Sequence, residues 1–209
     1  MNGIVIATTG TAWGLIATVA LVVAGIVLTY VLLAKGSLTL DLGWGRSMHP
    51  LGPIVLAVAA PREIVFEQIS APYLGRMPRE LRDKVEVLER GEGMVIAAHR
   101  TKVRGFVTIT VEAVAFDPPE RVRFRLLRGP VPHVVEHFLL HEVPDGGTEL
   151  EYAGELGADL WVLGRLWGRR VAKIWVGTVA ASLERIKAGS EERARAQERR
   201  AGSGGAPET

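Results

Sequence analysis

Histidine and glutamate side chains are the residues of this chain whose types and positions could support chemistry. His133, His137 and His141 recur every four residues in a β-branched, apolar stretch that predicts a strand. Four-residue spacing favours metal binding on a helix. On a strand it places the imidazoles too far apart to share one ion about 2.1 Å from each nitrogen. We therefore expect no metal site here and interpret the three histidines as a solvated or half-buried row.

His99 and Glu136 are the candidates for an acid–base or orienting role. Arg100 and Lys102 mark the outer face of a strand, so alternation turns His99 inward among small apolar neighbours. A single inward histidine is more often a hydrogen-bonded core or cavity residue than a general base. Glu136 is either a buried acid with a raised pKa or an outward residue beside Arg123, and the outward position is preferred.

Other kinds of site are not indicated by the sequence. It has no cysteine, which removes disulfides, thiolate metal sites and a cysteine nucleophile. No Ser-His-Asp spacing, acidic metal cluster, glycine-rich phosphate loop or GxGxxG pattern occurs. The net charge is +2, and basic residues are interleaved with acidic ones, so nucleic-acid binding is not expected. No cofactor is predicted.

The segment that indicates the cellular location of the protein is an uncharged run of 23 residues at 12–34. Twelve of these residues are Leu, Ile or Val. As a helix it would be roughly 35 Å long, enough to cross a hydrocarbon core of about 30 Å. Trp13 and Tyr30 lie near its ends, where aromatic rings favour the headgroup layer. The run is too long for a signal peptide, and no basic residue precedes it. We predict one transmembrane helix.

Membrane orientation follows from the positive charges. Lys35, Arg46 and Arg62 all follow the span, so the C-terminal side is predicted to be cytoplasmic. Residues 1–11 would then form a short extracytoplasmic N-terminus. The expected location is the cell membrane, with a single pass and a cytoplasmic domain.

Three segments follow the span. Residues 35–53 are rich in glycine and end at a proline, which is typical of a linker next to a membrane. Residues 54–188 carry the patterns of one folded domain, and residues 189–209 have too few apolar residues to pack, which predicts a disordered, charged tail. The domain is predicted to contain a strand at 54–59, a helix from Pro61 to about Ile69, strands at 84–89, 94–103, 106–116, 121–127, 133–143 and 148–156, and a helix from Asp159, its N-cap, to about Ala188.

Strand faces follow from alternation where charges mark one side. Three arginines share a face of the strand 121–127, so Val122, Phe124 and Leu126 face inward. Counting back across the turn at 117–120 places Glu112 opposite Arg125, as an outward ion pair. The odd-numbered residues of that strand would then face inward: Val107, Ile109, Val111 and Ala113.

The strand 133–143 has two alternative faces. A two-residue turn at Asp145-Gly146 points His137 and His141 inward. A three-residue turn that includes Gly147 points the even-numbered residues inward instead, with Glu136 buried beside Phe138 and Leu140. A one-residue displacement exchanges the two faces completely.

The last helix carries a stripe of aromatic, small and apolar residues at three- and four-residue steps: Trp161, Gly164, Gly168, Val171, Trp175 and Thr178. Two glycines inside a helix indicate close approach to the sheet or to a ligand. The basic residues Arg165, Arg169, Arg170 and Lys173 lie largely away from this stripe. Such a run is usually a solvated face, and on an anchored domain it can also contact anionic headgroups.

The order and spacing of four motifs resemble the START-like superfamily, also called SRPBCC, of polyketide cyclases, dehydrases and lipid-transport proteins. The matching segments are APREIVFEQIS at 60–70, DPPERVRFRLL at 117–127, PDGGTELEY at 144–152 and the Trp- and Gly-containing helix that follows. The resemblance covers residues 54–187 and implies an α+β helix-grip fold, in which a seven-stranded antiparallel sheet curls around a long C-terminal helix. The transmembrane helix is not part of the family pattern.

The resemblance implies that the space between sheet and helix is the functional part, with residues 70–82 at its entrance. A hydrophobic small molecule or lipid is the expected ligand, oriented by His99 and Tyr152. A cyclase-, dehydratase- or hydrolase-type enzyme using His99 or Glu136 as acid or base is the first alternative, and a ligand-free scaffold is the second. The expected lining residues are Val95, Ala97, His99, Val122, Phe124, Leu126, Leu150, Tyr152, Trp161, Val171 and Trp175.

Overall fold

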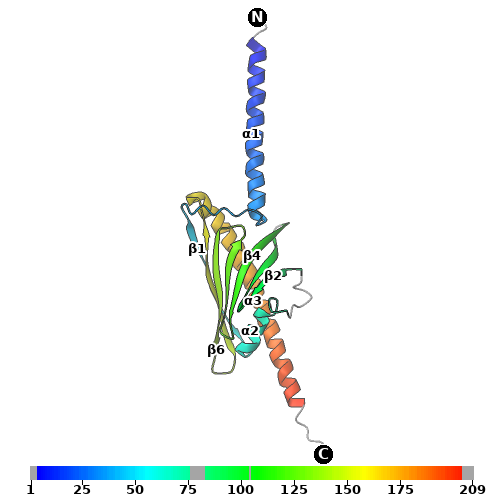
Figure 1. The fold of residues 1–209 in the computed structure, drawn as a ribbon. Helices are drawn as coiled ribbons and strands as arrows, with labels where there is room; N and C mark the ends of the chain where they lie inside the picture. Colours follow the sequence, from blue (N-terminus) through cyan, green and yellow to red (C-terminus); the bar gives the residue numbers. More distant parts are fainter. Residues whose placement is uncertain (1–3, 76–82, 104, 204–209) are drawn as a thin grey trace, which may run out of the picture.

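The computed structural model describes residues 4–75, 83–103 and 105–203. Helix α1 (Ile4–Ala34) extends away from the rest of the chain (Figure 1). Its segment Ala12–Ala34 has a mean hydropathy of 2.6, and it is exposed except for its last residues, which are partly buried against the domain. The hydroxyls of Thr18 and Thr29 donate to the carbonyls of Gly14 and Gly25 inside the helix. By length and composition, α1 can cross a membrane.

The domain is built on one seven-stranded antiparallel sheet in the order β1-β7-β6-β5-β4-β3-β2. Consecutive strands from β2 to β7 are neighbours, as the turn residues between them predict. The strands are β1 (Ser47–Val58), β2 (Val85–Gly91), β3 (Met94–Val103), β4 (Phe106–Asp117), β5 (Arg121–Arg128), β6 (His133–Glu142) and β7 (Thr148–Ala158).

Two helices cover one face of this sheet. Helix α3 (Trp161–Ser203) runs diagonally across it and packs on β1 and β7, and the short helix α2 (Arg62–Ser70) lies beside α3 (Figure 1). The hydrophobic core lies between the sheet and the two helices and includes Val65, Leu150 and Leu183, all completely buried. The chain therefore has the helix-grip fold that its sequence motifs predict.

Two predicted boundaries are wrong. β1 begins at Ser47, inside the predicted linker, because its first half pairs with β7 as far as Ala158. Helix α3 does not end near Ala188 but continues to Ser203. Beyond Ala188 it still buries Ser190 and Ala194, and Arg193 forms an ion pair with Glu67 of α2. Contact with α2 gives this polar segment a partner that its composition does not indicate.

Asp159 does not cap α3 as predicted but holds the linker. Its buried carboxylate accepts hydrogen bonds from the amides of Leu42 and Gly43 and forms an ion pair with Arg46 at 2.7 Å. The hydrogen bond from Arg46 favours the charged carboxylate more than burial disfavours it. The pKa of Asp159 therefore lies below its usual value. The segment between α1 and β1 is thus tied to the start of α3.

Candidate functional site

β4 turns its even-numbered residues toward the helices, which corrects the predicted face of Glu112. Asp117 pairs with Arg121, so the turn has three residues, and Glu112 lies opposite Leu126 instead of Arg125. This one-residue difference exchanges the two faces. Glu112 is 5% exposed. The odd-numbered residues expected inward lie on the outer face instead: Val107, Ile109, Val111 and Ala113.

Glu112 belongs to a buried polar group that we call the histidine cluster, made of Tyr73, His99, Thr110 and Glu112. The Nδ1 atom of His99 lies 3.1 Å from Oε2 of Glu112, although the ring N–H does not point straight at this oxygen. The Nε2 atom of His99 is 3.0 Å from the hydroxyl of Tyr73. The hydroxyl of Thr110 donates to Oε1 of Glu112 at 2.7 Å. His99 thus faces the interior, as its strand pattern predicts.

β6 turns Glu136 inward, with Val134, Phe138 and Leu140. Glu142 pairs with Thr148, so the connection has an odd number of residues, like the three-residue alternative. The preferred outward position of Glu136 beside Arg123 is therefore wrong. Its Oε2 atom accepts hydrogen bonds from the Tyr152 hydroxyl at 2.5 Å and from Trp175 Nε1 at 2.7 Å. We call Glu136, Tyr152 and Trp175 the glutamate cluster.

Aromatic rings connect the two clusters across the inner face of the sheet. Tyr73 packs against Phe124 at a centroid distance of 5.9 Å, Phe124 against Phe138 at 5.5 Å, and Phe138 against Tyr152 at 5.3 Å. Two of the three contacts are edge-to-face, an arrangement that aromatic rings favour. The two acidic groups thus lie in an interior that is otherwise largely apolar and aromatic.

This environment raises the pKa of Glu136. Burial, together with the negative charge of Glu112, raises the pKa of Glu136 to about 7, against the lowering effect of the hydrogen bonds from Tyr152 and Trp175 and of the charge of His99. No described residue donates a hydrogen bond to its Oε1 atom. Glu136 can therefore hold or release a proton near neutral pH, and one of its oxygens is without a hydrogen bond from a described residue.

In the histidine cluster the charged forms of the side chains are favoured instead. Burial disfavours both charges, but the attraction between His99 and Glu112 outweighs it. The pKa of His99 is therefore above its usual value and the pKa of Glu112 is below its own. The interior thus holds an ion pair near a carboxyl group whose pKa is about 7. Pairs of titratable groups with separated pKa values are typical of sites for acid–base chemistry.

The structure brings together most of the residues predicted to line the interior. Trp175 is partly buried against the core, and Trp161 does not join the others because it is 61% exposed at the start of α3, against Gly45. The predicted entrance at 70–82 lies largely outside the described residues. The remaining predicted residues face the interior: Val95, Ala97, His99, Val122, Phe124, Leu126, Leu150, Tyr152 and Val171.

The row of histidines on β6 is not part of either cluster. His133 is 3.0 Å from Glu155 of β7, on the outer face. Within the described part of the chain, no three His, Asp or Glu side chains are grouped so that they could hold a metal ion.

Sequence reasoning did not identify Tyr73, Thr110 or Glu112. Tyr73 follows α2 in a turn segment, where alternation gives no information. β4 carries apolar residues on both faces, so Thr110 and Glu112 can be assigned only from the turn length. The signal in the sequence that could have placed Thr110 and Glu112 on the inner face was the turn at 118–120, if it had been assigned an odd number of residues.

Comparison with known proteins supports the fold. No family model and no curated protein matches the chain. Among solved structures, it resembles the Zhui aromatase/cyclase from Streptomyces sp. R1128, with a TM-score of 0.58 and 18% identity over 70% of this chain and 96% of that one. Norcoclaurine synthase from Thalictrum flavum matches with a TM-score of 0.54 and 15% identity over 68% and 86%. These likenesses confirm the helix-grip fold.

Proposed function

We propose that this protein is a membrane-anchored binding protein for a hydrophobic small molecule or lipid, held between the curved sheet and α3. The observation that carries this proposal is Glu136, buried between Tyr152 and Trp175, with no hydrogen bond from a described residue to its Oε1 atom. A buried carboxyl group lowers stability unless it is fully paired, so packing alone gives no reason to retain it. A ligand with one polar group and a large apolar part would satisfy both the carboxyl and the aromatic surface.

The fold is consistent with this proposal. The Thalictrum flavum enzyme was solved in complex with dopamine and hydroxybenzaldehyde, two small aromatic molecules. In the present chain, the rings of Phe124, Phe138 and Tyr152 would provide the apolar contacts. His99 would provide a second polar contact beside Tyr73.

Acid–base catalysis, of the cyclase or dehydratase type, is the second candidate function. The pKa of Glu136, about 7, favours it, because a carboxyl group that titrates near neutral pH can both accept and donate a proton. The ion pair of His99 and Glu112 supplies neighbouring groups with different pKa values.

Ligand binding can be followed through Trp175. In the full chain, with the other four tryptophans replaced by phenylalanine, we expect a saturable change of Trp175 emission on titration with long-chain lipids, quinones or polycyclic aromatics. Glu136→Gln should weaken binding about tenfold, because it replaces one charge-assisted hydrogen bond by a neutral one. Glu149→Gln, a change of the same kind on the exposed face of β7, should bind like the parent.

Mass spectrometry of molecules that copurify with the full chain would identify the ligand. If the parent converts that ligand, a loss of turnover of 10²-fold or more in Glu136→Gln, with affinity changed about tenfold, would establish catalysis instead of binding alone. No saturable response and no copurifying molecule would contradict both functions and favour a scaffold filled by its own aromatic side chains.

The anchor is proposed from α1, with the domain on the cytoplasmic side. The full chain is expected to remain with membranes after extraction with alkaline carbonate. Val22→Arg/Ile26→Arg should release it, because each arginine near the centre of a span costs about 3 kcal/mol for insertion. The matched control, Val22→Leu/Ile26→Leu, should remain bound, and release of the parent by carbonate would contradict the anchor.

A further inference from the structure

The start of α3 exposes an unusual amount of apolar surface. Trp161, Val162, Leu163 and Leu166 are 61%, 61%, 71% and 59% exposed. Trp44 of the adjoining linker is 66% exposed, and its carbonyl accepts the amide hydrogen bond of Leu160. A contiguous patch of large apolar side chains at one end of a domain indicates a surface that is covered in use. We call these five residues the apolar end.

The apolar end lies beside the point where α1 leaves the domain. The hydroxyl of Thr108 donates to the carbonyl of Ala34, and the amide of Ile109 donates to the carbonyl of Lys35. The ring of Tyr30 packs edge-on against Trp167 of α3, with centroids 5.7 Å apart. The base of α1 and the first turns of α3 are therefore held at the same end of the domain (Figure 1).

A shallow, open depression at this junction combines apolar and basic side chains. It has a volume of about 580 Å³ and is lined by Tyr30, Leu163, Leu166, Trp167 and Arg170. A tyrosine near the end of a membrane span marks the depth of the headgroup layer. The depression would therefore lie at the boundary between acyl chains and phosphates.

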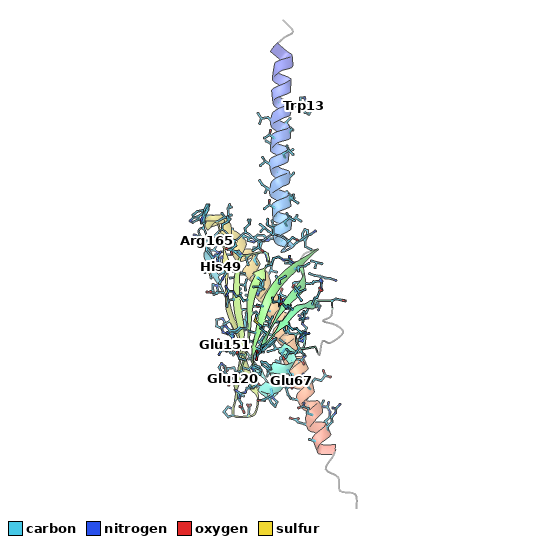
Figure 2. The ribbon with its side chains drawn as sticks, viewed as in Figure 1. Trp13, His49, Glu67, Glu120, Glu151 and Arg165 are labelled. Carbon is cyan, nitrogen blue, oxygen red and sulfur yellow. The ribbon has the colours of Figure 1, made fainter. Side chains whose placement is uncertain are left out.

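Basic side chains of α3 lie beside the apolar end. Arg165, Arg169 and Arg170 are exposed and form no ion pair with a described residue. Figure 2 shows Arg165 at the end of the domain nearest α1. Basic side chains are attracted to the anionic surface of a cytoplasmic leaflet, and acidic ones are repelled by it.

We propose that the apolar end and these three arginines form a second membrane contact, which inserts into the leaflet that α1 enters. The side chains of Trp161, Leu163 and Leu166 lie in the interfacial layer, and the arginines bind phospholipid phosphates. The domain is thereby held against the bilayer. This inference rests on the proposed function only through the membrane location of α1.

Site-specific labels in the full chain test the proposal, because the parent has no cysteine. Leu163→Cys, Val22→Cys and Glu120→Cys place an environment-sensitive fluorophore on the apolar end, inside α1 and at the opposite end of the domain. The labelled proteins are reconstituted in phosphatidylcholine vesicles with 30% phosphatidylglycerol, a mixture chosen to carry anionic headgroups. Spin-labelled lipid should quench the fluorophore at positions 22 and 163 and leave the one at 120 unaffected.

The three labels separate the two proposals. Quenching at 22 without quenching at 163 would overturn the second contact and leave the anchor intact, whereas no quenching at 22 would contradict the anchor. A blue-shifted but unquenched fluorophore at 163 would mean that protein, not lipid, covers the apolar end, and would also overturn the inference.

Charge removal supplies a second measurement. Arg165→Gln/Arg169→Gln/Arg170→Gln, combined with Leu163→Cys, should weaken docking about a hundredfold on anionic vesicles, since each basic residue near the surface contributes about fivefold. The matched control Arg121→Gln/Arg123→Gln/Arg125→Gln, on exposed positions of β5, should leave quenching at 163 unchanged. Equal quenching in both triple variants would overturn the assigned role of the three arginines.

Discussion

Glu136→Gln is expected to stabilise the folded protein by about 3 kcal/mol at pH 8 and to change its stability little below pH 4.5. The folded state holds the proton of Glu136 up to a pKa of about 7, whereas the unfolded chain releases it near 4.5. Stability from this group is therefore fully present below about pH 4.5 and is lost as the pH rises through about 7. Because glutamine does not ionise, the variant does not lose this stability as the pH rises. Its side-chain oxygen can still accept hydrogen bonds from Tyr152 and Trp175.

Equilibrium unfolding by urea in a non-ionic detergent, followed by circular dichroism at several pH values from 4.5 to 8.5, measures this effect. Glu149→Gln on the exposed face should follow the parent at every pH. A Glu136→Gln protein that is no more stable than the parent at pH 8 would show that the carboxyl group is better solvated or better paired than its surroundings indicate. Stabilisation together with weaker ligand binding would identify Glu136 as a residue retained for function at the expense of stability.

Glu112→Gln is expected to have the opposite effect, a loss of about 2 to 3 kcal/mol near pH 5.5. The substitution leaves His99 buried without its counter-charge, while the hydroxyl of Thr110 keeps an acceptor. The raised pKa of His99 means that its contribution is fully present below pH 6.5 and is lost as the pH rises through the folded-state value. The lowered pKa of Glu112 means that its contribution is present above 4.5 and is lost at lower pH. The cost should therefore be largest between these limits.

A double-mutant cycle with His99→Gln isolates the pair. We expect the double variant to recover a large part of the loss, with an interaction free energy of about 2 kcal/mol at pH 5.5 that decreases toward pH 8.5. Additive losses that do not depend on pH would show that Glu112 and His99 act only through packing. Glu86→Gln, which removes an exposed partner of Arg100, should cost less than about 1 kcal/mol and serves as the control.

Much of the fold follows from local patterns. The strand Met94–Val103 has the predicted boundaries, and the other strands of the domain differ by a few residues at their ends, apart from β1. Alternation of apolar and charged residues, interrupted by glycine- and proline-containing turns, is a short-range property, and it was sufficient to predict six consecutive antiparallel strands and a closing helix. The inward position of His99 was predictable for the same reason, because Arg100 and Lys102 mark the opposite face.

The sequence by itself thus determined the order of the elements, the apolar first helix and the faces of strands that carry charge on one side. Only the tertiary structure decided the faces of β4 and β6, which bring Glu112 and Glu136 inside. Both strands are apolar on both faces, so their orientation depends on turn length, and one residue exchanges the faces. The course of α3 beyond Ala188 also depends on tertiary contact, because its polar sequence becomes ordered only where Ser190 and Ala194 are buried beside α2.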